Sequence, residues 1–325
     1  MGLLINGKWT QDEAGKADKT GRFQRVTSSL RNWITPDGAP GPSGEGGFRA
    51  EPGRYHLYIS LACPWAHRTL IFRKLKGLEG MISLSNVHWL MAEEGWSFVP
   101  GPGVIPDPIF GAKAMHEVYS GAHSDYTGRA TVPVLFDKKT GRIVNNESSE
   151  IIRMLNSAFD DVGATAGDFY PADLRAKIDA LNERIYGSVN NGVYRAGFAS
   201  SQEAYEEAVW PLFETLDWLD AQLENQRYLC GARLTEADWR LFTTLVRFDP
   251  VYHGHFKCNL RRIVDYPNLS AYLRDLYQTP GVAETVDFDH IKRHYYMSHK
   301  NVNPSGVVPV GPVMALDAPH GREHL

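Results

Sequence analysis

The stretch YHLYISLACPWAHRTL, residues 55–70, changes from strand-like to helix-like sequence around a single cysteine. Residues 55–61 are rich in the aromatic and β-branched side chains typical of strands. Pro64 suits the first turn of a helix, where its missing N–H group costs nothing. Cys63 is therefore expected at a strand-to-helix junction, where free N–H groups and the positive end of the helix dipole point toward its sulfur. Such a position favours the thiolate, the nucleophilic form of cysteine.

Ala66 stands where a two-cysteine redox site would carry its second thiol. With alanine there, no neighbouring thiol can resolve a mixed disulfide at Cys63, so the resolving thiol must come from solution. Cys230 and Cys258 lie in a region expected to be helical, with no ready approach to Cys63. Glutathione is the abundant cytosolic candidate, so Cys63 predicts a glutathione site. A buried structural cysteine is the alternative, against which the adjoining Pro64 argues.

The apolar pattern divides the chain into an α/β part and a helical part. Residues 1–50 contain a hairpin signal at Asn6-Gly7 and a Pro/Gly-rich loop, which predicts an extension laid against other parts. Residues 51–160 alternate strands and helices, with a strand over 82–90 and a helix near 112–119. Residues 161–300 have helical periodicity, and 301–325 form a Pro/Gly-rich tail.

Two features of the helical part are specific. Thr235 and Asp238 form a capping box that predicts a helix through Val246. Pro211 lies inside a long amphipathic pattern and is expected to kink that helix.

Other parts of a glutathione site are expected near two further motifs. Thr131-Val132-Pro133 begins a strand, and a cis Val132–Pro133 bond would let the Val132 backbone pair with a cysteinyl backbone. Glu147 and Ser148 begin a helix, where Ser148 can bind the γ-glutamyl carboxylate and Glu147 its ammonium group. An ordinary helix cap is the alternative interpretation of Glu147 and Ser148.

Composition excludes several classes of protein. The 325 residues carry a net charge of −4, which gives no indication of a nucleic-acid or anionic-membrane partner. There is no leader-like start and no apolar run long enough to span a bilayer, so the sequence predicts a cytoplasmic protein with reduced thiols. His253, His255 and Cys258 could suggest zinc, but a fourth ligand at suitable spacing is missing, so no metal is expected.

The motifs CPWA at 63–66, TVP at 131–133 and ES at 147–148 resemble those of glutathione transferases. A narrower set resembles the glutathionyl-hydroquinone reductases, the Xi class, along nearly the whole chain, and is closest to the bacterial members: FQRVTSSLRNWI (23–34), NNGVYRAGF (190–198), LVRFDPVYHGHFKCN (245–259) and FDHIKRHYY (288–296). The resemblance implies a thioredoxin-like α/β domain followed by an all-α domain, the glutathione transferase fold. It also implies a homodimer formed through the helical half.

The resemblance further implies a role for individual residues. Cys63 would take glutathione from a glutathionyl-hydroquinone, and Tyr194 would donate and accept a proton. Tyr252 and Tyr295 would complete the aromatic substrate pocket, although the sequence alone does not separate Tyr295 from Tyr296. The residues implied to hold the co-substrate glutathione are Trp96, Arg129, Thr131, Val132, Glu147 and Ser148.

The chemistry of these residues agrees with the reduction of glutathionyl-hydroquinones. Attack on sulfur leaves negative charge on the ring, so a nearby acid such as a phenol must supply a proton. A general thiol transferase or dehydroascorbate reductase of the Omega type shares the chemistry of Cys63 and needs no tyrosine acid. A non-catalytic interaction module is a further alternative, because fold does not fix function.

Overall fold

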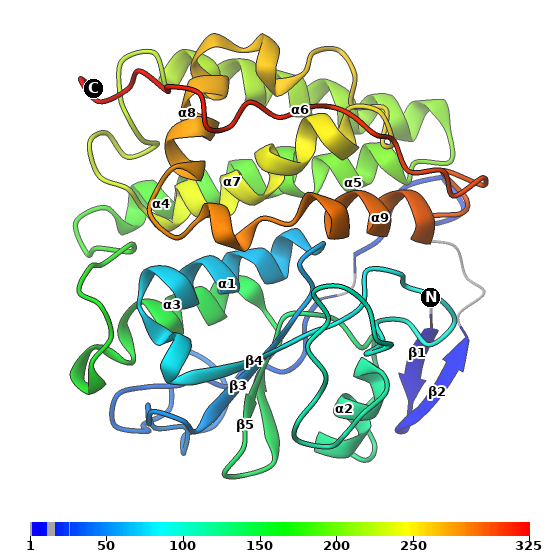
Figure 1. Ribbon diagram of the computed structural model, residues 1–325, viewed down its shortest axis with the longest axis vertical. Helices are drawn as coiled ribbons and strands as arrows, with labels where there is room; N and C mark the ends of the chain where they lie inside the picture. The colour runs from blue at the N-terminus through cyan, green and yellow to red at the C-terminus, as the bar shows by residue number, and fades with distance from the viewer. Residues whose placement is uncertain (1, 12–16, 26) are drawn as a thin grey trace. The chain divides into compact units, whose positions relative to one another are not determined.

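A computed structural model describes residues 2–11, 17–25 and 27–325 of the chain (Figure 1). They divide into two compact units. The first lies within Met1–Ala14, Val26–Gly167 and Asp287–His294, and the second within Gly15–Arg25, Asp168–Val286 and Tyr295–Leu325. The N-terminal extension therefore contributes residues to both units. Near the C-terminus, the boundary between the two units falls within helix α9, between His294 and Tyr295.

The strands all belong to the first unit. The hairpin predicted at Asn6-Gly7 is confirmed, since both residues have positive φ angles of 48° and 74° between antiparallel β1 and β2. The main sheet has the order β4-β3-β5-β6, in which β3 and β4 are parallel and the other pairs antiparallel. The strands are β1 (Gly2–Ile5), β2 (Lys8–Gln11), β3 (Tyr55–Ile59), β4 (Ile82–Asn86), β5 (Val134–Asp137) and β6 (Arg142–Asn145).

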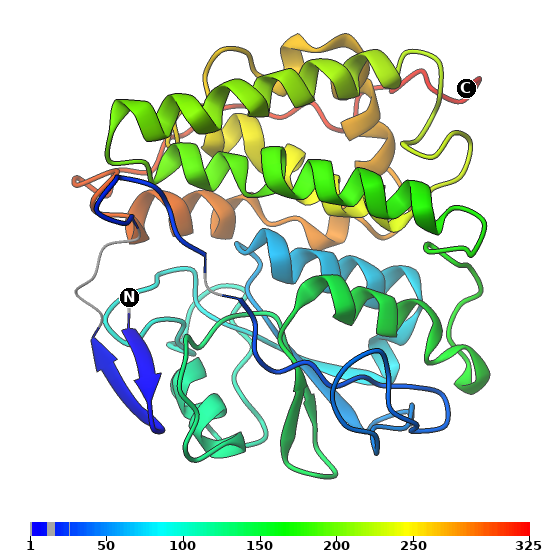
Figure 2. The same cartoon turned by 180° about the vertical axis from the view of Figure 1, so that it is seen from behind.

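Helices α1 and α3 lie side by side along the main sheet in both views (Figures 1 and 2). Every residue of β3 is buried, as expected for a central strand covered on both faces. The helices of this unit are α1 (Pro64–Leu75), α2 (Met115–Ala122) and α3 (Ser148–Ser157), with short 3₁₀ helices at Leu78–Gly80 and Asp160–Val162.

The N-terminal extension covers the outer edge of strand β6. The Asn32 N–H group donates to the carbonyl oxygen of Val144 at 2.9 Å, and Asn146 N–H donates to Leu30 O at 3.1 Å. Arg31 forms an ion pair with Glu150 of α3. The extension thus pairs backbone groups that an exposed edge strand would leave open to other chains.

The second unit is a helical bundle in which α6 lies alongside α5 (Figure 2). Its helices are α4 (Arg175–Ile185), α5 (Gly192–Gly197), α6 (Gln202–Gln222), α7 (Glu236–Arg247) and α8 (Pro267–Tyr277), with π-helical turns at Tyr186–Asn190 and Phe248–Tyr252 and 3₁₀ turns at Ile263–Asp265 and Ala283–Thr285. Helix α9 (Phe288–Ser298) carries residues of both units.

Helix α7 is buried along its whole length. Its predicted capping box is confirmed, because the carboxylate of Asp238 accepts the Thr235 N–H at 2.8 Å. The same carboxylate accepts the backbone N–H of Leu229 at 2.9 Å and the hydroxyl of Tyr272 at 2.8 Å. Burial raises the pKa of Asp238, and these donors compensate the cost of placing a carboxylate in the core.

Chain segments after residue 301 lie against the helical unit without regular structure. The side chain of Gln278 donates to Leu316 O at 2.7 Å, and Arg322 donates to Gln226 O at 2.6 Å. Among the described residues, no helix has both the length and the apolar character needed to cross a membrane.

Two expectations about elements need correction. The strand expected over 82–90 ends at Asn86, because His88 N–H turns away to bond Ser97 O. The helix expected from residue 112 begins only at Met115, since the carboxylate of Glu117 takes the Lys113 N–H. Helix α6 contains Pro211, as expected, and Pro211 lies on an exposed face where water can reach the carbonyl left without its helical partner.

Candidate active site

Cys63 occupies the N-cap of α1, four residues after strand β3 ends at Ile59. Its backbone is extended, with φ −77° and ψ 121°, and Pro64 follows in the first helical turn. Cys63 N–H donates to Ser60 O at 3.1 Å, and Cys63 O accepts the N–H of His67 at 2.9 Å. The thiol is partly exposed, whereas Cys230 and Cys258 are buried. The structure thus confirms the predicted strand-to-helix junction.

The thiol of Cys63 faces the segment that begins β5. Its Sγ atom donates to the carbonyl oxygen of Val132 at 3.6 Å, and the Val132–Pro133 peptide bond is cis. The hydroxyl of Tyr119 donates to Thr131 O at 3.1 Å and accepts the Asn146 side-chain N–H at 3.1 Å. A chain of hydrogen bonds therefore holds the backbone beside Cys63 in place.

Glu147 is the N-cap of α3, as the helix-cap interpretation predicts. Its carboxylate accepts the Ser149 N–H at 3.1 Å and a hydroxyl from Ser28 of the extension at 3.2 Å. Burial acts to raise the pKa of Glu147, but the hydrogen bonds from Ser149 and the charges of Arg68 and Arg31 outweigh it and leave that pKa below its usual range. The carboxylate therefore stays ionised at neutral pH.

Ser148 lies in the first turn of α3 and is buried. The guanidinium of Arg68, itself 1% exposed, donates to Ser148 Oγ at 3.5 Å and lies over the Trp65 ring at 4.5 Å. A buried cation and a helix N-terminus thus meet at this hydroxyl, an arrangement suited to an anion such as a carboxylate.

Trp96 and Arg129 lie in loops of the same unit. The Trp96 ring stacks on His294 at 4.6 Å, and His294 Nδ1 is 2.9 Å from Trp89 O. Arg129 is part-buried in the connection between α2 and β5, next to Gly128, which exchanges two backbone hydrogen bonds with Leu4. All the residues predicted to hold glutathione thus belong to the first unit.

The three predicted tyrosines meet in the second unit. The phenol oxygens of Tyr194 and Tyr295 are 2.5 Å apart, and those of Tyr252 and Tyr295 are 2.9 Å apart. Tyr252 and Tyr295 are buried, whereas Tyr194 is only partly buried. Burial raises the pKa of Tyr252 and Tyr295 well above its usual value, and negative charge on Tyr194 would raise both further. Tyr194 is therefore the phenol of this cluster that is most accessible from outside.

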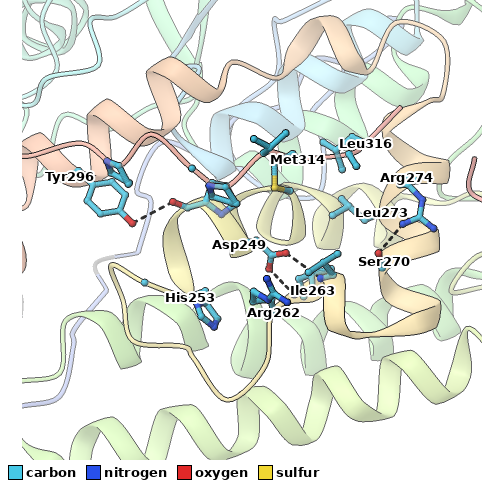
Figure 3. Close-up of a pocket in the computed structure, with 18 residues that line it drawn as sticks. Asp249, His253, Arg262, Ile263, Ser270, Leu273, Arg274, Tyr296, Met314 and Leu316 are labelled. Atoms are coloured by element: carbon cyan, nitrogen blue, oxygen red, sulfur yellow. Dashed lines mark hydrogen bonds between the residues drawn. The ribbon is translucent and has the colours of Figure 1, made fainter. Parts of the chain in front are cut away.

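The structure separates Tyr295 from its neighbour Tyr296. The hydroxyl of Tyr296 donates to Pro250 O at 3.4 Å and takes no part in the phenol cluster. Its ring lines a cavity of about 480 Å³ between the π-helical turn, α8 and the tail, with Asp249 and Met314 among the other lining residues (Figure 3). This cavity is separate from the phenol cluster.

His253 lines that same cavity, whereas His255 lies beside His299, with 3.2 Å between their ring nitrogens. Within the described parts of the chain, no group of three or more His, Cys, Asp or Glu side chains is placed to hold a metal ion.

Several contributors were missed from the sequence. Tyr119 bonds Thr131 and Asn146, and Ser28 bonds Glu147 from the extension; no local motif marks Tyr119 or Ser28. Asn146, which directly precedes Glu147, could have been noticed as a polar residue at a helix start. His294 needs the position of α9, which sequence periodicity does not provide.

Two family models match the chain: the glutathione S-transferase N-terminal domain over residues 62–158 and the glutathione S-transferase C-terminal domain over 202–275. Glutathionyl-hydroquinone reductase YqjG from Escherichia coli is 59% identical, with 99% of each chain covered, and reductase PcpF from Sphingobium chlorophenolicum is 58% identical, with 97% and 98% covered. A Xi-class transferase structure from Natrialba magadii has a TM-score of 0.91 at 47% identity, covering 100% of this chain and 98% of the other. This chain belongs to the Xi class of the glutathione transferases.

Membership of the Xi class confirms the predicted fold, a thioredoxin-like domain followed by a helical domain. The glutathione-bound structure of YqjG, a glutathione transferase homologue from Escherichia coli, has a TM-score of 0.93 to this chain, at 57% identity and 99% coverage of both. The Xi-class assignment also covers the extension and the tail, because the aligned regions include nearly all of both chains.

Proposed function

We infer that the protein is a glutathionyl-hydroquinone reductase, which uses reduced glutathione to release hydroquinone from a glutathionyl-hydroquinone. Two relatives of that name, 59% and 58% identical over nearly their full length, support it. The observation in this chain that carries the proposal is the partly exposed thiol of Cys63 at the start of α1, with Ala66 in place of a second cysteine. Such a thiol can take up glutathione and needs a second glutathione to be released.

The reaction has two balanced steps. In the first, the Cys63 thiolate attacks the sulfur of the glutathionyl-hydroquinone, so that a disulfide forms and the sulfur–carbon bond breaks. The electron pair of that bond goes to the ring carbon, which takes a proton and becomes part of the hydroquinone. In the second, the thiolate of free glutathione attacks the disulfide, which gives oxidised glutathione and regenerates Cys63.

The residues of the first unit hold the glutathione moiety. The Val132 backbone pairs with the cysteinyl backbone, as an added strand would. Ser148 and the start of α3 bind the γ-glutamyl carboxylate, and the ionised Glu147 pairs with its ammonium group. Trp96, Arg129 and Thr131 complete the site.

The phenol cluster supplies the proton. Tyr194 is the donor and acceptor, since it is only partly buried while the other two phenols are buried, and Tyr295 and Tyr252 stabilise its phenolate by donating hydrogen bonds in sequence. The aromatic rings of Tyr252 and Tyr295 also offer a surface against which a hydroquinone can pack.

The test compares two reactions in three proteins. Release of hydroquinone from a glutathionyl-hydroquinone and reduction of hydroxyethyl disulfide are followed in wild type, Cys63→Ala and Tyr194→Phe. We expect Cys63→Ala to lose both reactions, and Tyr194→Phe to lose about 100-fold in the first alone, because only that reaction needs an acid. Tyr296→Phe is the matched control, since its hydroxyl lies outside the cluster. Full activity in Cys63→Ala, or an unchanged first reaction in Tyr194→Phe, would refute the corresponding role.

A general thiol transferase of the Omega type is the second candidate. A relative from Schizosaccharomyces pombe, 48% identical over 91% of this chain, is named glutathione S-transferase omega-like 2. That function predicts efficient reduction of hydroxyethyl disulfide or dehydroascorbate, and equal activity toward glutathionyl-hydroquinones in wild type and Tyr194→Phe.

The protein acts as a homodimer in a reducing cytoplasm. Exposed apolar side chains on the helical unit support association, among them Trp210 at 55%, Leu260 at 48% and Val264 at 57% exposure. Sedimentation at micromolar concentration tests the dimer, and a monomer at that concentration would contradict it. The dependence on reduced glutathione supports the compartment, because such thiols persist in cytosol.

A further inference from the structure

A short segment of the N-terminal extension, residues 17–25, belongs to the helical unit and is fixed at the start of α6. The guanidinium of Arg22 donates to both carboxylate oxygens of Glu207, at 2.8 and 2.6 Å. Ser201, the N-cap of α6, donates its hydroxyl to Thr20 O at 3.1 Å. Gly21 has a φ of +83°, and a Cβ atom there would lie 2.7 Å from Ser201 Oγ, so the close approach requires glycine.

This anchor places two side chains of the segment over Tyr194. The ring of Phe23 lies 6.3 Å from the Tyr194 ring at an angle of 28°, and 5.6 Å from Phe198. The Cζ atom of Arg25 is 5.3 Å from the centroid of the Tyr194 ring and 5.7 Å from that of Phe23. Both distances fall within the range in which a cation is attracted to the face of an aromatic ring.

Other titratable and charged groups among the described residues also lie near Tyr194. Tyr252 and Tyr295 face it as neutral phenols, and the charge of Arg247 acts on both of them. The paired rings of His255 and His299 pack on Tyr295 rather than on Tyr194. Arg25, by contrast, lies over the Tyr194 ring itself.

We propose that Arg25 is a positioning residue that stabilises the ionised form of Tyr194 and so sets the pH range in which this phenol exchanges its proton. The proposal rests on the catalytic role proposed above for Tyr194. A guanidinium keeps its charge at any pH of interest. Its attraction to the ring increases when the phenol becomes a phenolate, because the ring then carries negative charge. Arg25 is exposed, so the effect is modest and is weakened by salt.

The experiment measures hydroquinone release against pH in wild type, Arg25→Gln and Arg25→Lys. In the plot of release rate against pH, we expect Arg25→Gln to shift the transition that depends on Tyr194 to a pH about half a unit higher. We also expect it to slow hydroquinone release about two- to fivefold at neutral pH. Arg25→Lys should keep a pH profile and a release rate close to those of wild type because it keeps the charge. The wild-type profile in high salt should approach that of Arg25→Gln, whereas a purely structural role would not respond to salt in this way.

Arg195→Gln is the matched control, because it removes an exposed charge from the residue next to Tyr194 on α5. An equal shift in Arg195→Gln would show a general charge effect and overturn the proposal, as would a profile of Arg25→Gln identical to that of wild type. Thermal melts of each variant verify folding.

Tyr194→Phe separates this proposal from the proposed function. If Tyr194→Phe is slow and Arg25→Gln has no further effect in that background, both the acid role and the inference are supported. If Tyr194→Phe is slow but the Arg25→Gln profile matches that of wild type, only the inference fails. If Tyr194→Phe is as fast as wild type, the role of Tyr194 fails and the inference with it.

Discussion

The phenol oxygens of Tyr194 and Tyr295 lie 2.5 Å apart, although 101 positions separate the two residues in the chain. Tyr295 is the central member of the cluster, since it also bonds Tyr252. We expect Tyr295→Phe to lower the free energy of unfolding by about 1–3 kcal/mol, because buried Tyr252 loses this partner. Urea denaturation measures the loss. The double variant with Tyr252→Phe should lose less than the sum of the single variants, and additive losses would show that the hydroxyls are uncoupled.

Alkaline pH should destabilise the helical unit through the same phenols. Burial raises the pKa of Tyr252 above the value of about 10 of a free phenol, so its contribution to stability is complete below pH 10 and is lost as the pH rises. The unfolded chain then releases a proton that the folded chain retains. We expect Tyr252→Phe to reduce the fall in unfolding free energy by up to about 1.4 kcal/mol per pH unit above pH 10. Tyr186→Phe, at a position 38% exposed, is the control that should leave the slope unchanged.

The three thiols should differ in their reaction with iodoacetamide. Cys63 is partly exposed, whereas burial raises the pKa of the Cys230 and Cys258 thiols. In the folded protein we expect peptide mapping to find label on Cys63 alone, and on all three residues after denaturation. Cys63→Ser should take up no label before unfolding. Labelling of Cys258 in the folded protein at the rate of Cys63 would contradict the burial described here.

Acid should weaken α3 through Glu147. The pKa of Glu147 lies below its usual value of 4.5, so the stability that this carboxylate contributes is present above pH 4.5 and is lost as the pH falls through the lower folded value. We expect Glu147→Gln to cost about 1 kcal/mol of unfolding free energy at pH 7 and much less at pH 3. Glu183→Gln, at an exposed position of α4, is the control. An equal cost at both pH values would show that the charge of Glu147 does not matter.

A second cysteine at position 66 should change how glutathione is released from its mixed disulfide with Cys63. Ala66 is buried in the first turn of α1, three residues after Cys63. In Ala66→Cys we expect an internal disulfide to displace bound glutathione and to slow turnover at least tenfold, because that disulfide must then be reduced in an additional step. Thiol titration and intact mass detect the disulfide. A variant that keeps a stable glutathione adduct would show that the two sulfurs do not meet.

Local sequence was informative where a single turn decides the structure. The junction at Cys63, the hairpin at Asn6-Gly7 and the capping box at Thr235 each depend on residues a few positions apart, and the structure has all three. Element ends were less predictable. The start of α2 depends on how the Glu117 side chain satisfies a backbone N–H group, which propensity does not indicate.

Long-range contacts explain what the sequence could not provide. Tyr252 ends a π-helical turn and Tyr295 lies on α9, so their meeting depends on packing across 43 positions, and only the family resemblance pointed to it. The contact of Arg25 with Tyr194 is of the same kind, because nothing in FQR marks a residue that reaches helix α5. The local motif of Cys63 predicts its chemistry, whereas the phenols become a site only through folding.

With Cys63 as its single active-site thiol, the protein cannot hold reducing equivalents in a dithiol of its own. The chain's remaining cysteines are buried in the helical unit, and alanine follows in the first turn of α1, so every catalytic cycle draws its electrons from the surrounding tripeptide pool. When that pool becomes oxidised, the sulfur remains capped and the reaction stops. The redox balance of the cell would then govern how fast quinol conjugates are cleared.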